Sequence, residues 1–129
     1  MTYELARTHC GNLGGYLAFP MDDQENSFIR QLVKAQYAWL GGDMIGRNGT
    51  FLTSGSAPEG ARPIRQTFWN TGEPNNPINE QCIMMIGSGK WNDGSCGSSY
   101  NFVCQFPYAG ACMWLPHPAF HDLQCYRKA

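Results

Sequence analysis

Carboxylate and amide side chains gather in two short segments in the second half of the chain. The first segment contains Glu73, Asn75 and Glu80, and the second contains Asn92 and Asp93. All of these groups are hard oxygen donors, which suit Ca²⁺, an ion that takes about six to eight oxygen ligands in flexible geometry. Sulfur and imidazole ligands would suit zinc or copper, and neither occurs within the two segments themselves, which are flanked by Cys82 and Cys96. The two segments therefore predict a calcium site.

Two helices are expected in the first third of the chain, each with its own capping residue. Thr2 is placed to cap a helix that runs to about Asn12. Asp22, with Glu25 three residues later, forms a capping box for a second helix that ends near Gln36. Helical spacing predicts the buried side chains of the two helices to be Leu5, Ala6, Cys10, Phe28, Ile29, Leu32 and Val33.

Short apolar runs predict several strands that follow the helices or lie between them. These runs lie at residues 16–19, 37–40, 82–86, 90–92 and 102–106. Residues 43–71 are instead dominated by Gly, Pro, Ser, Asn and Arg, and a loop of this length inside a compact domain is usually functional. Helices first and strands later predict an α+β fold.

Composition and charge exclude several classes of protein. With 129 residues, the chain is expected to form one domain. A net charge of -1 gives no basic field for nucleic acid or for an anionic membrane. No apolar run of about 18 residues is present, so no membrane insertion is expected, and charged residues near the N-terminus break any signal-peptide core.

Cysteine content indicates the compartment. Six cysteines in so short a chain favour an oxidising, extracellular location with three disulfides, and the sequence alone allows fifteen pairings. The glycosylation triplet at residues 48–50 fits a secreted surface loop. The sequence therefore predicts a secreted protein.

Motifs spread over most of the chain resemble the C-type lectin-like domain. Residues 2–10 are similar to the first helix and first cysteine of that family, and residues 38–42 (AWLGG) are similar to its WIGL core strand. Residues 14–18 and 22–28 resemble the intervening turn and the second helix. The order and spacing of these segments, together with EPN at 73–75 and WND at 91–93, carry the resemblance. It implies the α+β fold of that family, with two helices, short antiparallel sheets and a long calcium-binding loop region.

One segment stands at an unexpected end of the chain. The family usually opens with a hairpin of the form CxxGW…CY, whereas here a similar pattern, with Trp114 and Tyr126, follows the main body. We therefore expect a circular permutation with a body at residues 1–106, a connector at 107–111 and a relocated hairpin at 112–129. The alternative is an unrelated C-terminal extension that carries its own disulfide. A swapped dimer and other homo-oligomers remain open.

The resemblance also implies pairings and roles for individual residues. The disulfides it implies are Cys10–Cys104, Cys82–Cys96 and Cys112–Cys125. The residues implied to hold Ca²⁺, and with it two neighbouring sugar hydroxyls, are Glu73, Asn75, Glu80, Asn92 and Asp93, with a cis peptide bond before Pro74. The EPN form implies glycans with terminal mannose-type sugars (mannose, N-acetylglucosamine, fucose or glucose), whereas galactose binders usually carry QPD.

Departures from the family pattern limit the number of calcium ions. Asp43 matches one acid of a second calcium site, but Arg47 stands where another acid is often found. We therefore expect one calcium ion.

Two other function classes deserve comparison with a non-catalytic, calcium-dependent lectin. The same fold serves as a calcium-dependent ice- or protein-binding module, and the long polar loop is compatible with that use. A glycosidase with two carboxylates is disfavoured, because calcium would neutralise the acids and no His or Cys is poised as a base or nucleophile.

Overall fold

A computed structural model describes the chain except for residues 35, 48, 56–59, 77, 107–122 and 128–129, and it gives the backbone alone for 123–127. Two helices and seven strands make up the described part. None of the described helices combines the length and the apolar character needed to cross a membrane.

Both helices begin where their capping residues predict. Helix α1 covers Tyr3–Asn12, and the Thr2 hydroxyl accepts a hydrogen bond from the Leu5 amide. Helix α2 covers Asp23–Val33, and the Asp22 carboxylate accepts a hydrogen bond from the Glu25 amide at 2.8 Å. The second helix ends earlier than Gln36, because Lys34 leaves helical geometry with a φ of 60°.

The buried faces of the helices differ from the prediction at two positions. Leu5 is 59% exposed and Phe28 is 46% exposed, so the prediction that both are buried was wrong. Tyr3 and Asn26 take the inward positions instead, each one helical turn away from a buried neighbour on the same face. Both are polar residues that the apolar pattern passed over.

A single mixed sheet joins all seven strands. Its main path runs β1–β6–β2–β4–β5, with β3 paired to β2 and β7 paired to β6. The β2–β6 and β6–β7 pairs are parallel, so the expectation of antiparallel sheets holds only for the other pairs. The strands are β1 (Tyr16–Leu17), β2 (Ala38–Asp43), β3 (Leu52–Thr53), β4 (Cys82–Met85), β5 (Trp91–Gly94), β6 (Asn101–Phe106) and β7 (Leu123–Arg127).

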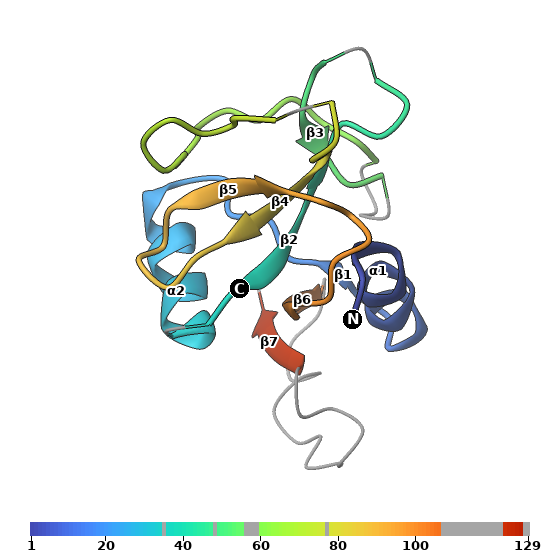
Figure 1. Ribbon diagram of the computed structural model, residues 1–129. Helices are drawn as coiled ribbons and strands as arrows, with labels where there is room; N and C mark the ends of the chain where they lie inside the picture. Colours follow the sequence, from blue (N-terminus) through green and yellow to red (C-terminus); the bar gives the residue numbers. More distant parts are fainter. Residues whose placement is uncertain (35, 48, 56–59, 77, 107–122, 128–129) are drawn as a thin grey trace.

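Alternation along the strands divides the interior into two clusters, one for each helix. Ala38, Leu40 and Val103 pack in the cluster that contains the buried face of α2. Trp39 and Phe102 pack in the other cluster, together with α1. Successive strand residues face opposite sides of a sheet, so one set of strands serves both helices. Figure 1 shows α1 and α2 on opposite sides of the strands, with the loop region gathered beyond β4 and β5.

Two disulfides tie this framework together. Cys10–Cys104 joins α1 to β6, and Cys82–Cys96 joins the start of β4 to the loop that follows β5. Both are pairs that the family resemblance implies. The third implied pair, Cys112–Cys125, lies outside the described residues because Cys112 is one of those not described.

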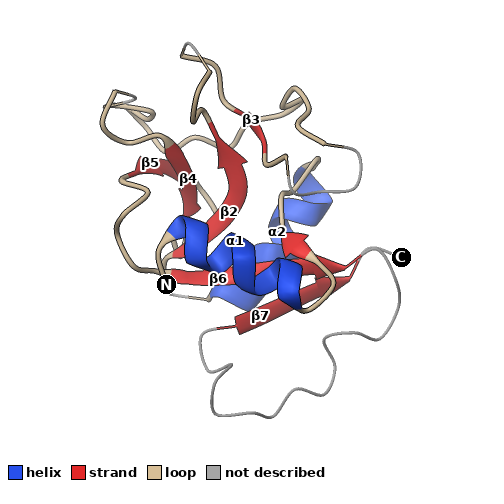
Figure 2. Cartoon of the chain, turned by 90° about the vertical axis from the view of Figure 1, so that its right-hand side faces the viewer, coloured by secondary structure: helices blue, strands red, loops and turns tan. Residues whose placement is uncertain are grey.

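The direction of β7 bears on the expected circular permutation. That arrangement requires the chain after Arg127 to run on into Thr2. However, β7 runs parallel to β6 and places Arg127 beside Phe106. The backbone of Met1 is instead hydrogen-bonded to the backbone of Tyr100, at the opposite end of β6. Figure 2 shows β6 and β7 side by side, with the start of the chain at one end of them. This direction does not support the permutation, which stays a prediction.

Candidate metal-binding site

The long loop reaches the predicted ligands by docking on strand β5. The Trp91 amide donates to the Phe68 carbonyl, and the Asn70 amide donates to the Trp91 carbonyl, both at 2.8 Å. A further bond, from the Glu73 amide to the Asn70 carbonyl at 2.9 Å, closes the turn that follows. These bonds fix residues 68–73 beside β5, and so bring Glu73 to the strand that carries Asp93.

Asp93 is the centre of the site. Asp93 is buried, with 4% of its surface exposed. Its carboxylate accepts hydrogen bonds from the backbone N–H of Asn75 at 3.2 Å and from the backbone N–H of Asn76 at 2.9 Å. Its own amide donates to Glu73 Oε2 at 3.4 Å. The peptide bond between Glu73 and Pro74 is cis. The structure therefore brings Glu73, Asn75 and Asp93 together across a sequence gap of some twenty residues.

The neighbouring Asp93 raises the pKa of two other acids of the site, Glu73 and Glu80. A hydrogen bond with the Asp93 side chain is the largest cause that raises the pKa of Glu73 to about 7, followed by burial and by the negative charge of Asp93. Burial first, and then the charge of Asp93, raises the pKa of Glu80. Within the described residues, no Lys or Arg side chain forms an ion pair with these acids. The described residues therefore leave the negative charge of these acids uncompensated.

The remaining two predicted ligands are less closely engaged. Within the described part of the chain, the side chains of Glu80 and Asn92 form no hydrogen bond with Glu73, Asn75 or Asp93. Asn92 Oδ1 is nevertheless buried and has no hydrogen-bond partner. A buried oxygen that accepts no hydrogen bond lowers the free energy of unfolding. A bound cation would remove this cost by coordinating the oxygen.

The fit to calcium depends on the amides as well as on the acids. No group of three or more His, Cys, Asp or Glu side chains among the described residues is placed to hold a metal ion. The predicted set contains three carboxylates and two amide oxygens, and calcium accepts both kinds of ligand. The orphaned Asn92 oxygen and the uncompensated acids therefore fit a hard divalent cation.

A buried asparagine on α2 supports the site from behind, and the sequence analysis missed it. Asn26 Oδ1 accepts a hydrogen bond from Trp91 Nε1, and Asn26 Nδ2 donates to the Gly89 carbonyl, both at 2.9 Å. These bonds hold the turn before β5 and the residue next to Asn92. Helical spacing could have identified it, because Asn26 lies three residues before the buried Ile29.

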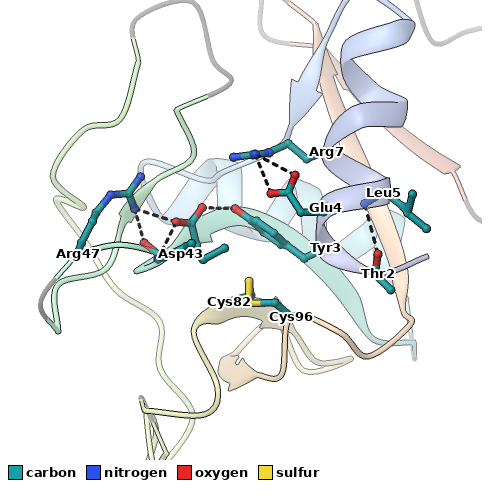
Figure 3. A network of polar contacts seen from close by, with 10 residues as sticks. Thr2, Tyr3, Glu4, Leu5, Arg7, Asp43, Arg47, Cys82 and Cys96 are labelled. Atoms are coloured by element: carbon teal, nitrogen blue, oxygen red, sulfur yellow. Dashed lines mark hydrogen bonds and ion pairs between the residues drawn. A yellow bond between two sulfur atoms is a disulfide. The ribbon is translucent and has the colours of Figure 1, made fainter.

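Asp43 lies in a second polar network that contains a cation of the protein itself. Its carboxylate accepts hydrogen bonds from the Tyr3 hydroxyl at 2.5 Å, from the Ile45 amide at 3.1 Å and from Arg47 Nη1 at 2.9 Å. Arg47 Nη1 also donates to the Asp43 carbonyl at 2.6 Å. Figure 3 shows Tyr3 and Arg47 converging on Asp43 from two sides. The acid expected to match a second calcium site is therefore already neutralised.

Comparison with known proteins places this geometry in a family. The family model described as the lectin C-type domain matches residues 1–106. Human Collectin-10 is 34% identical over 108 residues, which are 81% of this chain and 38% of that protein. The mouse low affinity immunoglobulin epsilon Fc receptor is 36% identical over 102 residues, 78% of this chain and 29% of the receptor. The chain thus spans about a third of the length of these relatives.

Solved structures agree on the fold. The carbohydrate-recognition domain of cow CD23, determined in the presence of a GlcNAc2Man3 oligosaccharide, superposes with a TM-score of 0.70 at 32% identity and covers 79% of this chain and 76% of that one. A calcium-independent type II antifreeze protein superposes with a TM-score of 0.66 at 29% identity, covering 78% of this chain and 74% of that one. From the family match and these likenesses, the chain belongs to the C-type lectin domain family.

Proposed function

We propose that this domain binds carbohydrate through calcium and catalyses no reaction. The observation that carries the proposal is the close approach of the Glu73 and Asp93 carboxylates with no ion-paired Lys or Arg among the described residues. Two acids in contact repel each other unless a proton or a cation lies between them. The cow CD23 domain, similar in fold and determined with an oligosaccharide, supports carbohydrate as the ligand.

The residues proposed to hold the ion are Glu73, Asn75, Glu80, Asn92 and Asp93. When bound, calcium supplies open coordination positions for two neighbouring sugar hydroxyls. The carboxylates of Glu73 and Glu80 would accept hydrogen bonds from these hydroxyls, while the amides of Asn75 and Asn92 would donate to them. Such paired donors and acceptors distinguish one hydroxyl geometry from another.

The EPN segment favours mannose-type sugars over galactose. In EPN the acid precedes the amide along the cis turn, so acceptors and donors occupy a fixed order around the ion. Galactose-binding relatives carry QPD, in which that order is reversed. We therefore propose glycans with terminal mannose, N-acetylglucosamine, fucose or glucose as ligands, in an extracellular setting.

Calorimetric titration of mannose and of galactose tests this function. Each sugar is titrated in calcium and again in excess chelator. Mannose should bind only in calcium, and galactose should give no heat. Calcium binding without a response to either sugar would overturn the carbohydrate assignment. A variant with Asp23→Asn, an exposed acid at the start of α2, controls for general loss of negative charge.

Ice binding is the second candidate, because a calcium-independent antifreeze protein shares the fold. That antifreeze protein is calcium-independent, whereas the acid pair of this chain favours a function that depends on calcium. Thermal hysteresis measured with and without calcium separates the two functions. Ice-growth inhibition together with silent sugar titrations would favour the ice-binding candidate.

The remaining proposals concern stoichiometry and the C-terminal segment. We propose one bound calcium ion per chain, since Arg47 already neutralises Asp43. We also propose that residues 112–129 form a hairpin closed by Cys112–Cys125, equivalent to the opening hairpin of the family. Peptide mapping without reduction tests the disulfide, and sedimentation tests whether the hairpin docks on a second copy. The circular permutation is the least supported part, because β7 runs parallel to β6.

A further inference from the structure

A pocket lies on the exposed face of α2, away from the proposed calcium site. Its volume is about 550 Å³, and its lining residues are Ser27, Arg30, Gln31, Lys34 and Gly87. Three of the five, Ser27, Arg30 and Gln31, lie on α2; Lys34 directly follows the helix, and Gly87 comes from the turn between β4 and β5. The lining contains two cations and no acid.

The positive charges of this pocket, on Arg30 and Lys34, form no ion pair with any described residue. Both residues are exposed, and both line this pocket, Arg30 from the last turn of α2 and Lys34 from the residue that follows the helix. Ser27 and Gln31 add a hydroxyl and an amide, which are neutral hydrogen-bond donors. Together these groups match an oxyanion.

The pocket is built on a rigid support. The turn that contains Gly87 is held to α2 by the hydrogen bond from Asn26 Nδ2 to the Gly89 carbonyl at 2.9 Å. A Cβ atom at Gly89 would lie 2.9 Å from Arg30 Cδ, so the aliphatic stem of Arg30 packs closely on this glycine. The guanidinium of Arg30 therefore extends from a fixed stem.

Lys34 gives a second, independent observation. It has a φ of 60° and a ψ of -128°, a region that residues other than glycine rarely adopt. The helix dipole favours a cation in the last turn, but backbone conformation at this position favours glycine. A lysine here carries backbone strain, and strained residues are found preferentially at functional sites.

We propose that this pocket binds a sulfate or carboxylate group carried on a saccharide, as a site distinct from the calcium site. Small-ligand pockets span about 300–1,000 Å³, so a free ion would fill little of this volume, whereas a sugar unit with an attached anion would occupy much of it. The inference goes beyond the proposed function and does not require it.

Binding of a sulfated tetrasaccharide by the full chain, measured in excess chelator, tests the proposal. Chelator removes any contribution of the calcium site, so failure of one proposal leaves the other untouched. The desulfated tetrasaccharide and inorganic sulfate serve as comparison ligands. We expect the sulfated form to bind, the desulfated form to be silent, and affinity to fall as salt is raised. Equal binding of the sulfated and desulfated forms, or no binding of either, would overturn the proposal.

Three substitutions localise the site. Arg30→Gln keeps the part of the stem that packs on Gly89, and Gln31→Glu adds a carboxylate of the same shape; each should weaken binding by about tenfold. Lys34→Gly should weaken binding similarly while it raises the melting temperature, because it removes the backbone strain. Loss of binding with a gain in stability cannot arise from misfolding.

A matched pair elsewhere on the surface provides the control. Arg7→Gln with Arg65→Gln removes the same charge as Arg30→Gln with Lys34→Gln, but from α1 and from the long loop. The control pair should retain affinity within about twofold, because exposed charges beyond a Debye length of about 8–10 Å are screened. Equal losses from both pairs would show a diffuse surface field and overturn the pocket assignment.

Discussion

Two regions of this domain each contain a buried aspartate, and the surroundings of the two aspartates differ. Asp43 is 2% exposed and receives donors from the Tyr3 hydroxyl, the Ile45 amide and the Arg47 guanidinium. Asp93 is 4% exposed and accepts hydrogen bonds from two backbone amides, but it contacts the acid Glu73 and forms no ion pair among the described residues. One region is neutralised by the chain itself, and the other is not.

The difference separates a structural carboxylate from a functional one. The guanidinium of Arg47 balances the negative charge of the buried Asp43, so no bound cation is required there. Two acids in contact, together with a buried amide oxygen that lacks a partner, form an incomplete arrangement that a cation would satisfy. Under the proposed function, Asp43 contributes to stability and Asp93 to ligand binding, and each role can be tested by removing one group.

The largest effect is expected from Asp93→Asn. This change retains the size of the side chain but removes a charge from the proposed calcium site. Calcium affinity should fall roughly a hundredfold or more, because even substitutions beside metal ligands typically cost 10–100-fold. Sugar binding should be lost with it. Calorimetric titration of calcium measures the change, and Asp23→Asn should leave both affinities unaltered. Calcium affinity that survives Asp93→Asn would remove the distinction between the two regions.

Arg47→Leu tests the self-neutralised region. It leaves the Asp43 carboxylate buried without its cation, and breaking a buried pair in this way typically costs about 3–5 kcal/mol. Urea unfolding measures the loss in the free energy of unfolding. Arg7→Leu is the matched control, because the Arg7–Glu4 pair is exposed and such pairs contribute about 0–1 kcal/mol. Similar losses for the two variants would mean that Arg47 contributes little to stability.

Tyr3→Phe removes one donor from Asp43 and leaves the cation in place. The ring still packs edge-on against Trp39, so the main loss is the hydrogen bond to the carboxylate. A hydrogen bond to a charged group contributes about 1.5–3 kcal/mol, which is the expected loss in the free energy of unfolding. The exposed Tyr37→Phe should be neutral. Burial, and then the charge of Asp43, raise the pKa of Tyr3, so its absorbance should not titrate with that of exposed tyrosines.

Much of the fold follows from local signals in the sequence. Thr2 and Asp22 act as helix caps because their side chains satisfy free amides of the first turn, a property of neighbouring residues alone. The parallel pairing of β2 with β6 could not be predicted in this way, because it joins segments about sixty residues apart. Leu5 and Phe28 were misplaced because polar residues, Tyr3 and Asn26, occupy the core positions through hydrogen bonds that hydrophobic spacing does not reveal.

The candidate site was predictable in its residue types but not in its geometry. The spacing of Glu73, Asn75 and Asp93 carries the family pattern, and the structure brings these residues together. The role of the Asn76 amide depends on the fold of the loop over β5, because any residue other than proline has an amide there. The sequence analysis used Arg47 only to argue against a second calcium ion. Its ion pair with Asp43, like the hydrogen bond from Tyr3, became evident only from the structure.

The last expected effect is a change in how the free energy of unfolding depends on pH. It should differ between the calcium-free and the calcium-bound domain. The folded pKa of Glu73 is about 7, above its ordinary value of 4.5. Without calcium, the folded state therefore binds more protons than the unfolded state between these values, so the free energy of unfolding should fall as pH rises from about 4.5 to 7. With calcium the trend should reverse, because protons compete with the ion for the same carboxylate and the ion binds more tightly as pH rises. Urea unfolding at a series of pH values, with chelator and with calcium, measures both slopes. If the free energy of unfolding changes with pH in the same direction with chelator and with calcium, Glu73 is not a calcium ligand. Arg47→Leu is the control: it leaves Glu73 and Asp93 intact, so calcium should still reverse the slope.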